Sequence, residues 1–109
     1  MTLTATPCYA NRYGYSDIDP FEVVRCVSDK TLEVRAMDAE RDPEWKPDWH
    51  VGGFAAHCSN QREQRWHITP NADNPVVRIR LQKDGKWKSS CGSKFYLSAE
   101  PVKFYDYNF

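Results

Sequence analysis

Residues 77–87 read VRIRLQKDGKW, and apolar and basic side chains alternate along this stretch until a polar turn. Alternation with a period of two is typical of a β-strand that has one buried face. A two-residue Asp-Gly loop would place Trp87 opposite Gln82, among arginines. A three-residue loop with Gly85 in the left-handed conformation instead pairs Trp87 with Leu81. We favour the three-residue loop because it buries the tryptophan.

The same register predicts a basic strand face. It places Arg80 opposite Lys88 and sets four cations on the exposed side, with Lys94 as a further member: Arg78, Arg80, Lys86 and Lys88. Such a face can contact phosphates, and a β surface with aromatic side chains can bind single strands. The alternative is a solvated face whose cations pair with carboxylates from the first half of the chain, and a formal net charge of zero favours it.

The charges are divided unevenly along the chain. Residues 1–60 hold 6 Lys and Arg against 10 Asp and Glu, whereas residues 61–109 hold 9 against 5. One domain can therefore carry two unlike faces, or the two sets can interleave on neighbouring strands and cancel.

A second hairpin is expected over residues 21–37, where two apolar runs flank a short polar turn at residues 28–30. A three-residue loop puts apolar side chains inward and an ion pair outward. The expected pairs are Val24 with Val34, Cys26 with Leu32, and Arg25 with Glu33.

Further strands are predicted over residues 64–69, 94–98 and 103–107, with a less clear one at 4–9. No stretch of ten residues carries apolar side chains at helical spacing. We therefore expect an all-β fold: one small domain over residues 1–109, a barrel of about six short strands. An SH3-like barrel is favoured, with an OB-like barrel or a small sandwich as alternatives.

Residues 38–60 break the alternation and are expected to form one long loop. Within it, Pro-acid-Trp occurs twice, ending at Trp45 and at Trp49. Proline restricts its own backbone and that of its neighbour, so the two rings should be held in defined directions. They would either bind a partner or fold back to close the open end of the barrel.

The segment after this pair is rich in small residues and then in hydrogen-bonding groups. His57, Asn60 and Gln61 are candidate ligand-binding side chains, with a turn-forming role as the alternative. His50, His57, Cys58 and His67 are zinc-compatible, but their spacing matches no usual metal site, so no metal and no cofactor are expected. Cys58 and His57 are adjacent on a predicted strand and point to opposite faces, which argues against a cysteine enzyme.

Membrane and secretory signals are not expected in this chain. No basic start is followed by an apolar run, and no stretch approaches the ~18 apolar residues of a membrane span. The four separated cysteines suggest reduced thiols. The aromatic end, Tyr105 to Phe109, is expected to dock into the sheet, or to offer an edge to a partner or a second copy, so that the protein is a monomer or a homodimer.

Three segments together resemble a group of short proteins encoded by bacteriophage and prophage genomes, over residues 10–109. They are GGFAAHCSNQ at residues 52–61, KDG at 83–85 and YDYNF at 105–109. The resemblance implies action inside a bacterial cell, in the host cytoplasm. It supplies no activity, cofactor or catalytic residue.

The leading hypothesis is a non-enzymatic accessory module that engages a host protein and modulates a defence or metabolic system. Its binding residues would be Trp45, Trp49, His57, Asn60 and Gln61. The first alternative is nucleic-acid binding through the basic strand face. The second is a metal- or cysteine-dependent enzyme, for which the chain offers no complete set of catalytic groups.

Overall fold

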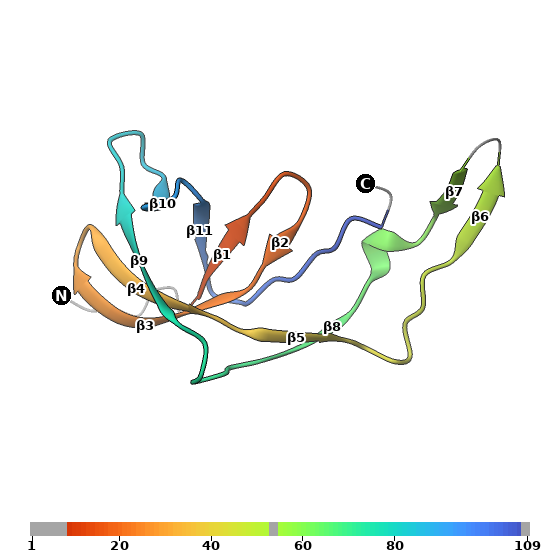
Figure 1. The fold of residues 1–109 in the computed structure, drawn as a ribbon, viewed down its shortest axis with the longest axis horizontal. Helices are drawn as coiled ribbons and strands as arrows, with labels where there is room; N and C mark the ends of the chain where they lie inside the picture. Colours follow the sequence, from red (N-terminus) through yellow and green to blue (C-terminus); the bar gives the residue numbers. More distant parts are fainter. Residues whose placement is uncertain (1–8, 53–54, 108–109) are drawn as a thin grey trace.

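A computed structural model describes residues 9–52 and 55–107. The molecule measures 54 × 28 × 26 Å, and its radius of gyration is 16.2 Å, against about 13 Å for a compact domain of this length. The excess comes from an arm that extends from one side of a small barrel (Figure 1).

Six antiparallel strands form the barrel, and pairing of the first with the last closes it. In chain order they are β1 (Tyr9–Tyr13), β3 (Phe21–Ser28), β4 (Thr31–Ala36), β9 (Val76–Leu81), β10 (Trp87–Ser89) and β11 (Lys94–Ser98). A short extra strand, β2 (Ile18–Asp19), pairs with β1. The expectation of a small all-β barrel with about six strands is confirmed, while the preference for an SH3-like type stays a prediction.

The barrel core comes from the inward positions of the alternating strands. Phe21, Val34, Ile79 and Phe95 are buried there, and the rings of Phe21 and Phe95 meet edge to face with centroids 5.1 Å apart. Trp87 is half-buried and packs against this cluster. The interior is therefore filled by side chains, and any site must lie on the outside.

The β9–β10 hairpin has the predicted register. Leu81 pairs with Trp87 and Arg80 pairs with Lys88. Gly85 adopts a φ of +84°, a left-handed conformation that glycine tolerates at no steric cost.

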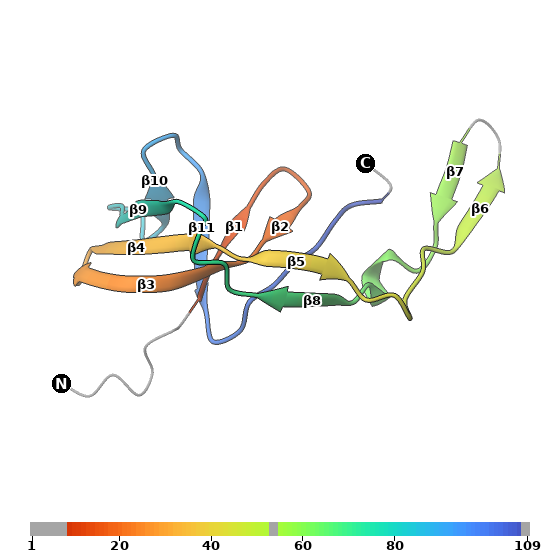
Figure 2. The same cartoon turned by 60° about the horizontal axis from the view of Figure 1, so that its bottom comes forward.

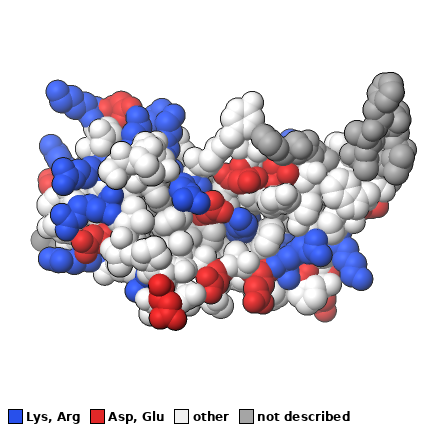
Figure 3. All heavy atoms as spheres, in the orientation of Figure 1, with Lys and Arg blue, Asp and Glu red and all other residues white. Residues whose placement is uncertain are grey.

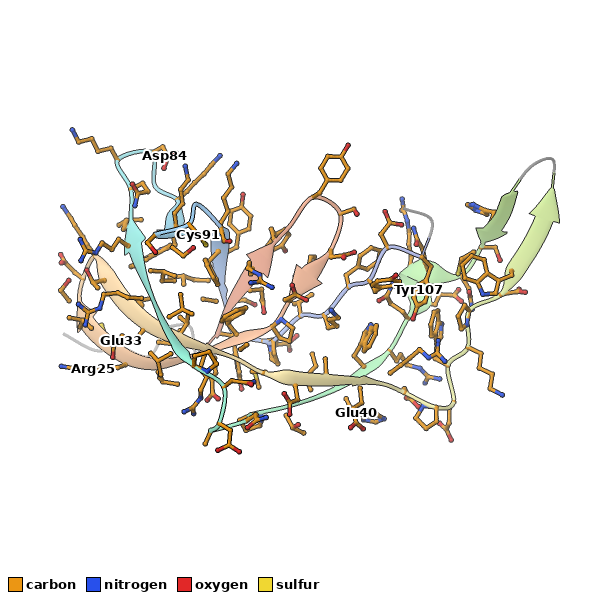
Figure 4. The ribbon with its side chains drawn as sticks, viewed as in Figure 1. Arg25, Glu33, Glu40, Asp84, Cys91 and Tyr107 are labelled. Atoms are coloured by element: carbon orange, nitrogen blue, oxygen red, sulfur yellow. The ribbon has the colours of Figure 1, made fainter. Side chains whose placement is uncertain are left out.

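The β3–β4 hairpin matches the expected register only in part. Cys26 pairs with Leu32, and Arg25 pairs with Glu33 at the outer end of the hairpin (Figure 4). The expected pairing of Val24 with Val34 is wrong. A bulge after Val23 inserts one unpaired residue, so Val23 faces Val34.

The arm is built from two small sheets. β5 (Asp38–Arg41) pairs with β8 (Trp66–Thr69), and β6 (Trp49–Gly52) pairs with β7 (Ala55–Cys58) at the far end (Figures 1 and 2). A single 3-10 turn, η1 (Gln61–Glu63), follows β7. Residues 38–60, expected as one loop, instead contain three strands. β5 continues the direction of β4 and pairs with β8, in the strand predicted at 64–69, whereas β6 and β7 pair with each other.

The predicted strand at residues 103–107 is wrong. Only one bridge forms in this segment, between Phe104 and Ile18, and the chain then runs along the arm towards η1 (Figure 1). The backbone of Phe104 bonds to Ile18 of β2, whereas side-chain amides of Gln64 and Gln61 bind the backbone of Tyr105 and Tyr107. The predicted strand at 4–9 lies outside the described residues except for Tyr9, which begins β1.

Candidate functional site

A row of cations crosses the outside of the barrel. Arg80 on β9 is directly opposite Lys88 on β10, and Lys88 is directly opposite Lys94 on β11. Directly opposed residues of antiparallel strands project from the same face. That face is the outer one, because the alternate residues Ile79 and Phe95 are buried in the core. We call Arg80, Lys88 and Lys94 the basic row.

Carboxylates do not neutralise the basic row. Arg78, one position along the same strand face, forms an ion pair with Glu33 at 2.9 Å, and Arg25 reaches the same carboxylate at 3.8 Å. Within residues 9–52 and 55–107, no ion pair is made by a member of the basic row. Carboxylates from the first half of the chain therefore neutralise the charge of Arg78, but among the described residues they do not neutralise the charges of the basic row.

Lys86 extends this charged surface towards the hairpin turn. It directly precedes β10 and lies two residues before Lys88. Its backbone N–H donates to the carboxylate of Asp84 at 3.0 Å. In the space-filling view, Lys and Arg gather over the end of the barrel that carries β9 and β10 (Figure 3).

Two tyrosines adjoin the basic row: Tyr13 on β1, and Tyr96 on β11 two residues after Lys94. Closure of the barrel places Tyr13 of β1 directly opposite Lys94. The Tyr13 ring meets that of Tyr96 at 4.6 Å between centroids and an interplanar angle of 73°. Both side chains are about 40 % exposed. Cations and aromatic rings thus share one outer face of the barrel.

Two depressions flank the basic row. On the β9 side, a groove of about 640 Å³ is lined by Arg78, Arg80, Gln82 and Lys88, among others. On the β1 side, an open notch of about 310 Å³ lies in the β1–β2 turn. Tyr15, at the tip of that turn, is 96 % exposed.

The two tryptophans of the predicted binding loop lie in the arm, so they do not close the barrel. Trp45 is buried and its ring lies 5.5 Å from that of Tyr107. The Trp49 ring lies 6.2 Å from the same tyrosine ring and is 46 % exposed. Tyr107, labelled in Figure 4, therefore contacts both tryptophans.

The polar groups of Asn60 and Gln61 hold the arm together. Asn60 accepts the Asp48 N–H at 2.7 Å and donates to the Lys46 carbonyl at 2.8 Å. The Gln61 side chain accepts the Tyr107 N–H at 2.9 Å.

His57 is exposed on β7. It occupies the position next to Cys58, the partner of Trp49, so His57 and Trp49 leave opposite faces of the hairpin. The structure does not bring the five predicted binding residues onto one surface.

The thiols and histidines that the structure describes are the groups that a metal- or cysteine-dependent enzyme would use. No group of three or more His, Cys, Asp or Glu side chains in the described part of the chain could hold a metal ion. Cys58 is buried, with its Sγ 3.4 Å from the Asn60 side-chain oxygen. Cys91 is exposed between β10 and β11, and hydrogen bonds from Ser89 and Ser93 lower the pKa of its thiol to about 7.

The sequence reasoning missed Tyr13, Tyr15 and Tyr96. Their local signal is weak, because tyrosines in short strands usually pack on a sheet. Tyr96 follows Lys94 by two residues on β11, whereas Tyr13 and Tyr15 come to the basic row only through the pairing of β1 with β11, two strands far apart in the chain.

Comparison with protein-family models, with curated proteins and with solved structures finds no match to this chain. None of the helical segments among the described residues is long and apolar enough to cross a membrane. The assignment of a function therefore depends on the geometry of the surface alone.

Proposed function

We propose that this protein binds nucleic acid through the outer face of β9, β10, β11 and β1. The observation that carries the proposal is the basic row, three cations in register on adjacent strands that have no carboxylate partner among the described residues. Like charges that face each other across strands destabilise a sheet. A bound polyanion would remove that repulsion.

The spacing of the row suits a phosphate backbone. Neighbouring strands lie about 4.8 Å apart, so the row extends roughly 10 Å from Arg80 to Lys94. Long Arg and Lys side chains can spread along several phosphates over that distance. The groove beside Arg78 and Arg80 gives the ligand a concave path onto the row.

Because the formal net charge of the chain is zero, the electrostatic attraction for a polyanion comes from the basic row and not from the molecule as a whole. If the three cations each neutralise one phosphate of a single strand, log K should fall with log salt with a slope of roughly −2. Rings beside the cations add stacking surfaces, which together with a basic track are typical of barrels that bind nucleic-acid strands.

The test is fluorescence anisotropy with labelled single-stranded 12-mers, DNA and RNA, between 20 and 200 mM salt. The triple variant Arg80→Gln/Lys88→Gln/Lys94→Gln should lose most of the affinity and most of the salt slope. The matched control removes the same charge from exposed cations of the arm: Arg41→Gln, Lys46→Gln and Arg62→Gln. Equal binding by the two triple variants, or no binding by the wild type at 20 mM salt, would contradict the proposal.

A second candidate function is protein binding by the arm, the hypothesis that the two tryptophans of residues 38–60 suggest in the sequence. The specific observation is an exposed aromatic surface in which Trp49 and Tyr105, each 46 % exposed, both contact Tyr107. Exposed tryptophan and tyrosine are over-represented among residues that dominate protein interfaces.

This candidate predicts capture of one host protein from bacterial lysate that survives high salt and nuclease. Trp49→Ala should abolish the capture, whereas the triple variant of the basic row should retain it. If nuclease treatment removes the captured protein, the capture depends on nucleic acid, and this result would contradict protein binding by the arm.

A further inference from the structure

We infer that the notch in the β1–β2 turn is a nucleobase subsite and that the ligand of the barrel face is single-stranded. This inference rests on the proposed nucleic-acid function and adds to it the part of the ligand that each region takes. The basic row would take phosphates, and the notch, lined by Tyr13, Tyr15, Ser16 and Ser93, would take a base.

The notch lies at one end of the basic row. Ser93 directly precedes Lys94 in the chain, and Tyr13 is directly opposite Lys94 across the barrel seam. A strand whose phosphates follow Arg80, Lys88 and Lys94 therefore reaches the notch within one further strand spacing. No second binding region has to be assumed.

Tyr15 offers a surface on which a base can stack. The side chain is 96 % exposed, so its ring gains little from burial in the protein itself. Stacking of a base would remove apolar ring surface from water, and it tolerates different sequences because every base has a flat π-face. Tyr13, half covered by Tyr96, supplies a second ring at the same end of the basic row.

The charged groups that line the notch favour binding of a base over binding of a phosphate. Its lining includes the carboxylates of Asp17 and Asp19. Asp19 is paired at 2.8 Å with both Arg12 and Lys103, and Asp17 accepts the Asp106 N–H at 2.8 Å. The guanidinium of Arg12 is therefore already engaged by a carboxylate. A phosphate would meet these carboxylates without a free cation of the notch, whereas the N–H groups of a base edge meet acceptors.

An unpaired strand fills such a subsite without breaking base pairs. Bases of a duplex are stacked and paired, so opening one face to a protein side chain costs the free energy of unstacking and unpairing. We therefore expect the barrel face to prefer a single strand over a duplex of the same length, although the duplex carries about twice as many phosphates.

The experiment compares three labelled probes of equal length: a mixed-sequence 12-mer, its duplex, and a 12-mer whose sugars lack bases. Wild-type protein should bind the 12-mer roughly tenfold more tightly than either of the other two. Tyr15→Ala should remove this preference and leave the affinity for the abasic probe and the salt slope unchanged. Tyr15→Phe should keep the preference, because it keeps the ring.

Tyr105→Ala is the matched control, because it removes another exposed tyrosine that lies in the arm. Thermal melting should show that Tyr15→Ala folds like the wild type, since an exposed ring adds little to stability. If Tyr15→Ala keeps the preference while the triple variant of the basic row loses binding, the subsite is refuted and the proposed function stands. If no probe binds the wild type at 20 mM salt, both are refuted.

Discussion

The side-chain amide of Gln64 is hydrogen-bonded to the backbone of Tyr105 in both directions. Its Nε2 donates to the Tyr105 carbonyl at 2.9 Å, and its Oε1 accepts the Tyr105 N–H at 2.8 Å. The same amide also reaches the Gln61 carbonyl and the indole N–H of Trp66. One side chain thus supplies the pair of bonds that a neighbouring strand would supply.

The side-chain amide of Asn11 likewise donates to and accepts from the backbone of residues 100–102. Its Nδ2 donates to the Glu100 carbonyl at 3.2 Å, and its Oδ1 accepts the Val102 N–H at 2.9 Å. Asn11 belongs to the barrel and Gln64 to the arm. The segment from 100 to 105 is therefore fixed to both parts, and it ties the arm to the barrel.

Gln64→Glu should destabilise the protein by about 1–3 kcal/mol, because the carboxylate keeps the acceptors and loses both donated bonds. Urea denaturation of wild type and variant measures the change. Gln82→Glu, at an exposed amide that makes one bond to the nearby Arg80 carbonyl, should change stability far less. Equal effects of the two substitutions would contradict the role given to Gln64.

Ile79→Ala should cost about 2–5 kcal/mol, because Ile79 is fully buried in the barrel core and the substitution leaves a cavity. Val76→Ala on the same strand, at an exposed position, should stay within about 0.5 kcal/mol of the wild type. The free energy of unfolding from urea titration checks both. A small effect at Ile79 would mean that the barrel is not packed as described.

Asp19→Asn should remove part of the acid dependence of stability. Burial raises the pKa of Asp19, but hydrogen bonds and charges from Arg12 and Lys103 outweigh it and hold the pKa below its ordinary value. A depressed carboxyl pKa stabilises the fold above the pKa of the unfolded chain, and this stability is lost as the pH falls through the folded pKa.

The urea midpoints of wild type and Asp19→Asn should therefore differ at pH 7 and converge towards pH 3. Asp84→Asn, in the exposed β9–β10 turn (Figure 4), is the control for the same carboxyl-to-amide change and should lower the midpoint at pH 7 less than Asp19→Asn does. A gap between wild type and Asp19→Asn that is constant with pH would exclude the proposed linkage.

Cys91 should react with iodoacetamide at a rate that rises with pH around a midpoint of about 7, because the thiolate is the reactive form. Ser89→Ala combined with Ser93→Ala should move this midpoint upward, since the two hydroxyls stabilise the thiolate. Mass spectrometry of the Cys91 peptide measures the rate. Cys58 is buried and should stay unmodified in the folded protein.

Local pairings were predictable and distant ones were not. The register of Leu81 with Trp87 follows from one turn and its glycine, so the residues between them determine it. The bulge after Val23 has no such signal, because Val23 and Val24 are the same residue type.

The barrel seam and the C-terminal segment depend on contacts far apart in the chain. No sequence pattern near Lys94 predicts that Tyr13 lies opposite it. The aromatic alternation from Tyr105 onward resembles a strand, but Gln64 occupies the place of the missing partner strand. The basic face of β9 and β10 was therefore predictable, whereas its aromatic half was not.

The length of the molecule affects what it can hold at one time. The basic row lies on the barrel and Trp49 lies in the hairpin at the other end of a 54 Å body (Figure 1). A strand bound across β9, β10 and β11 leaves Trp49 outside its footprint. If both proposed surfaces bind their ligands, their separation would let one molecule hold the two ligands at the same time.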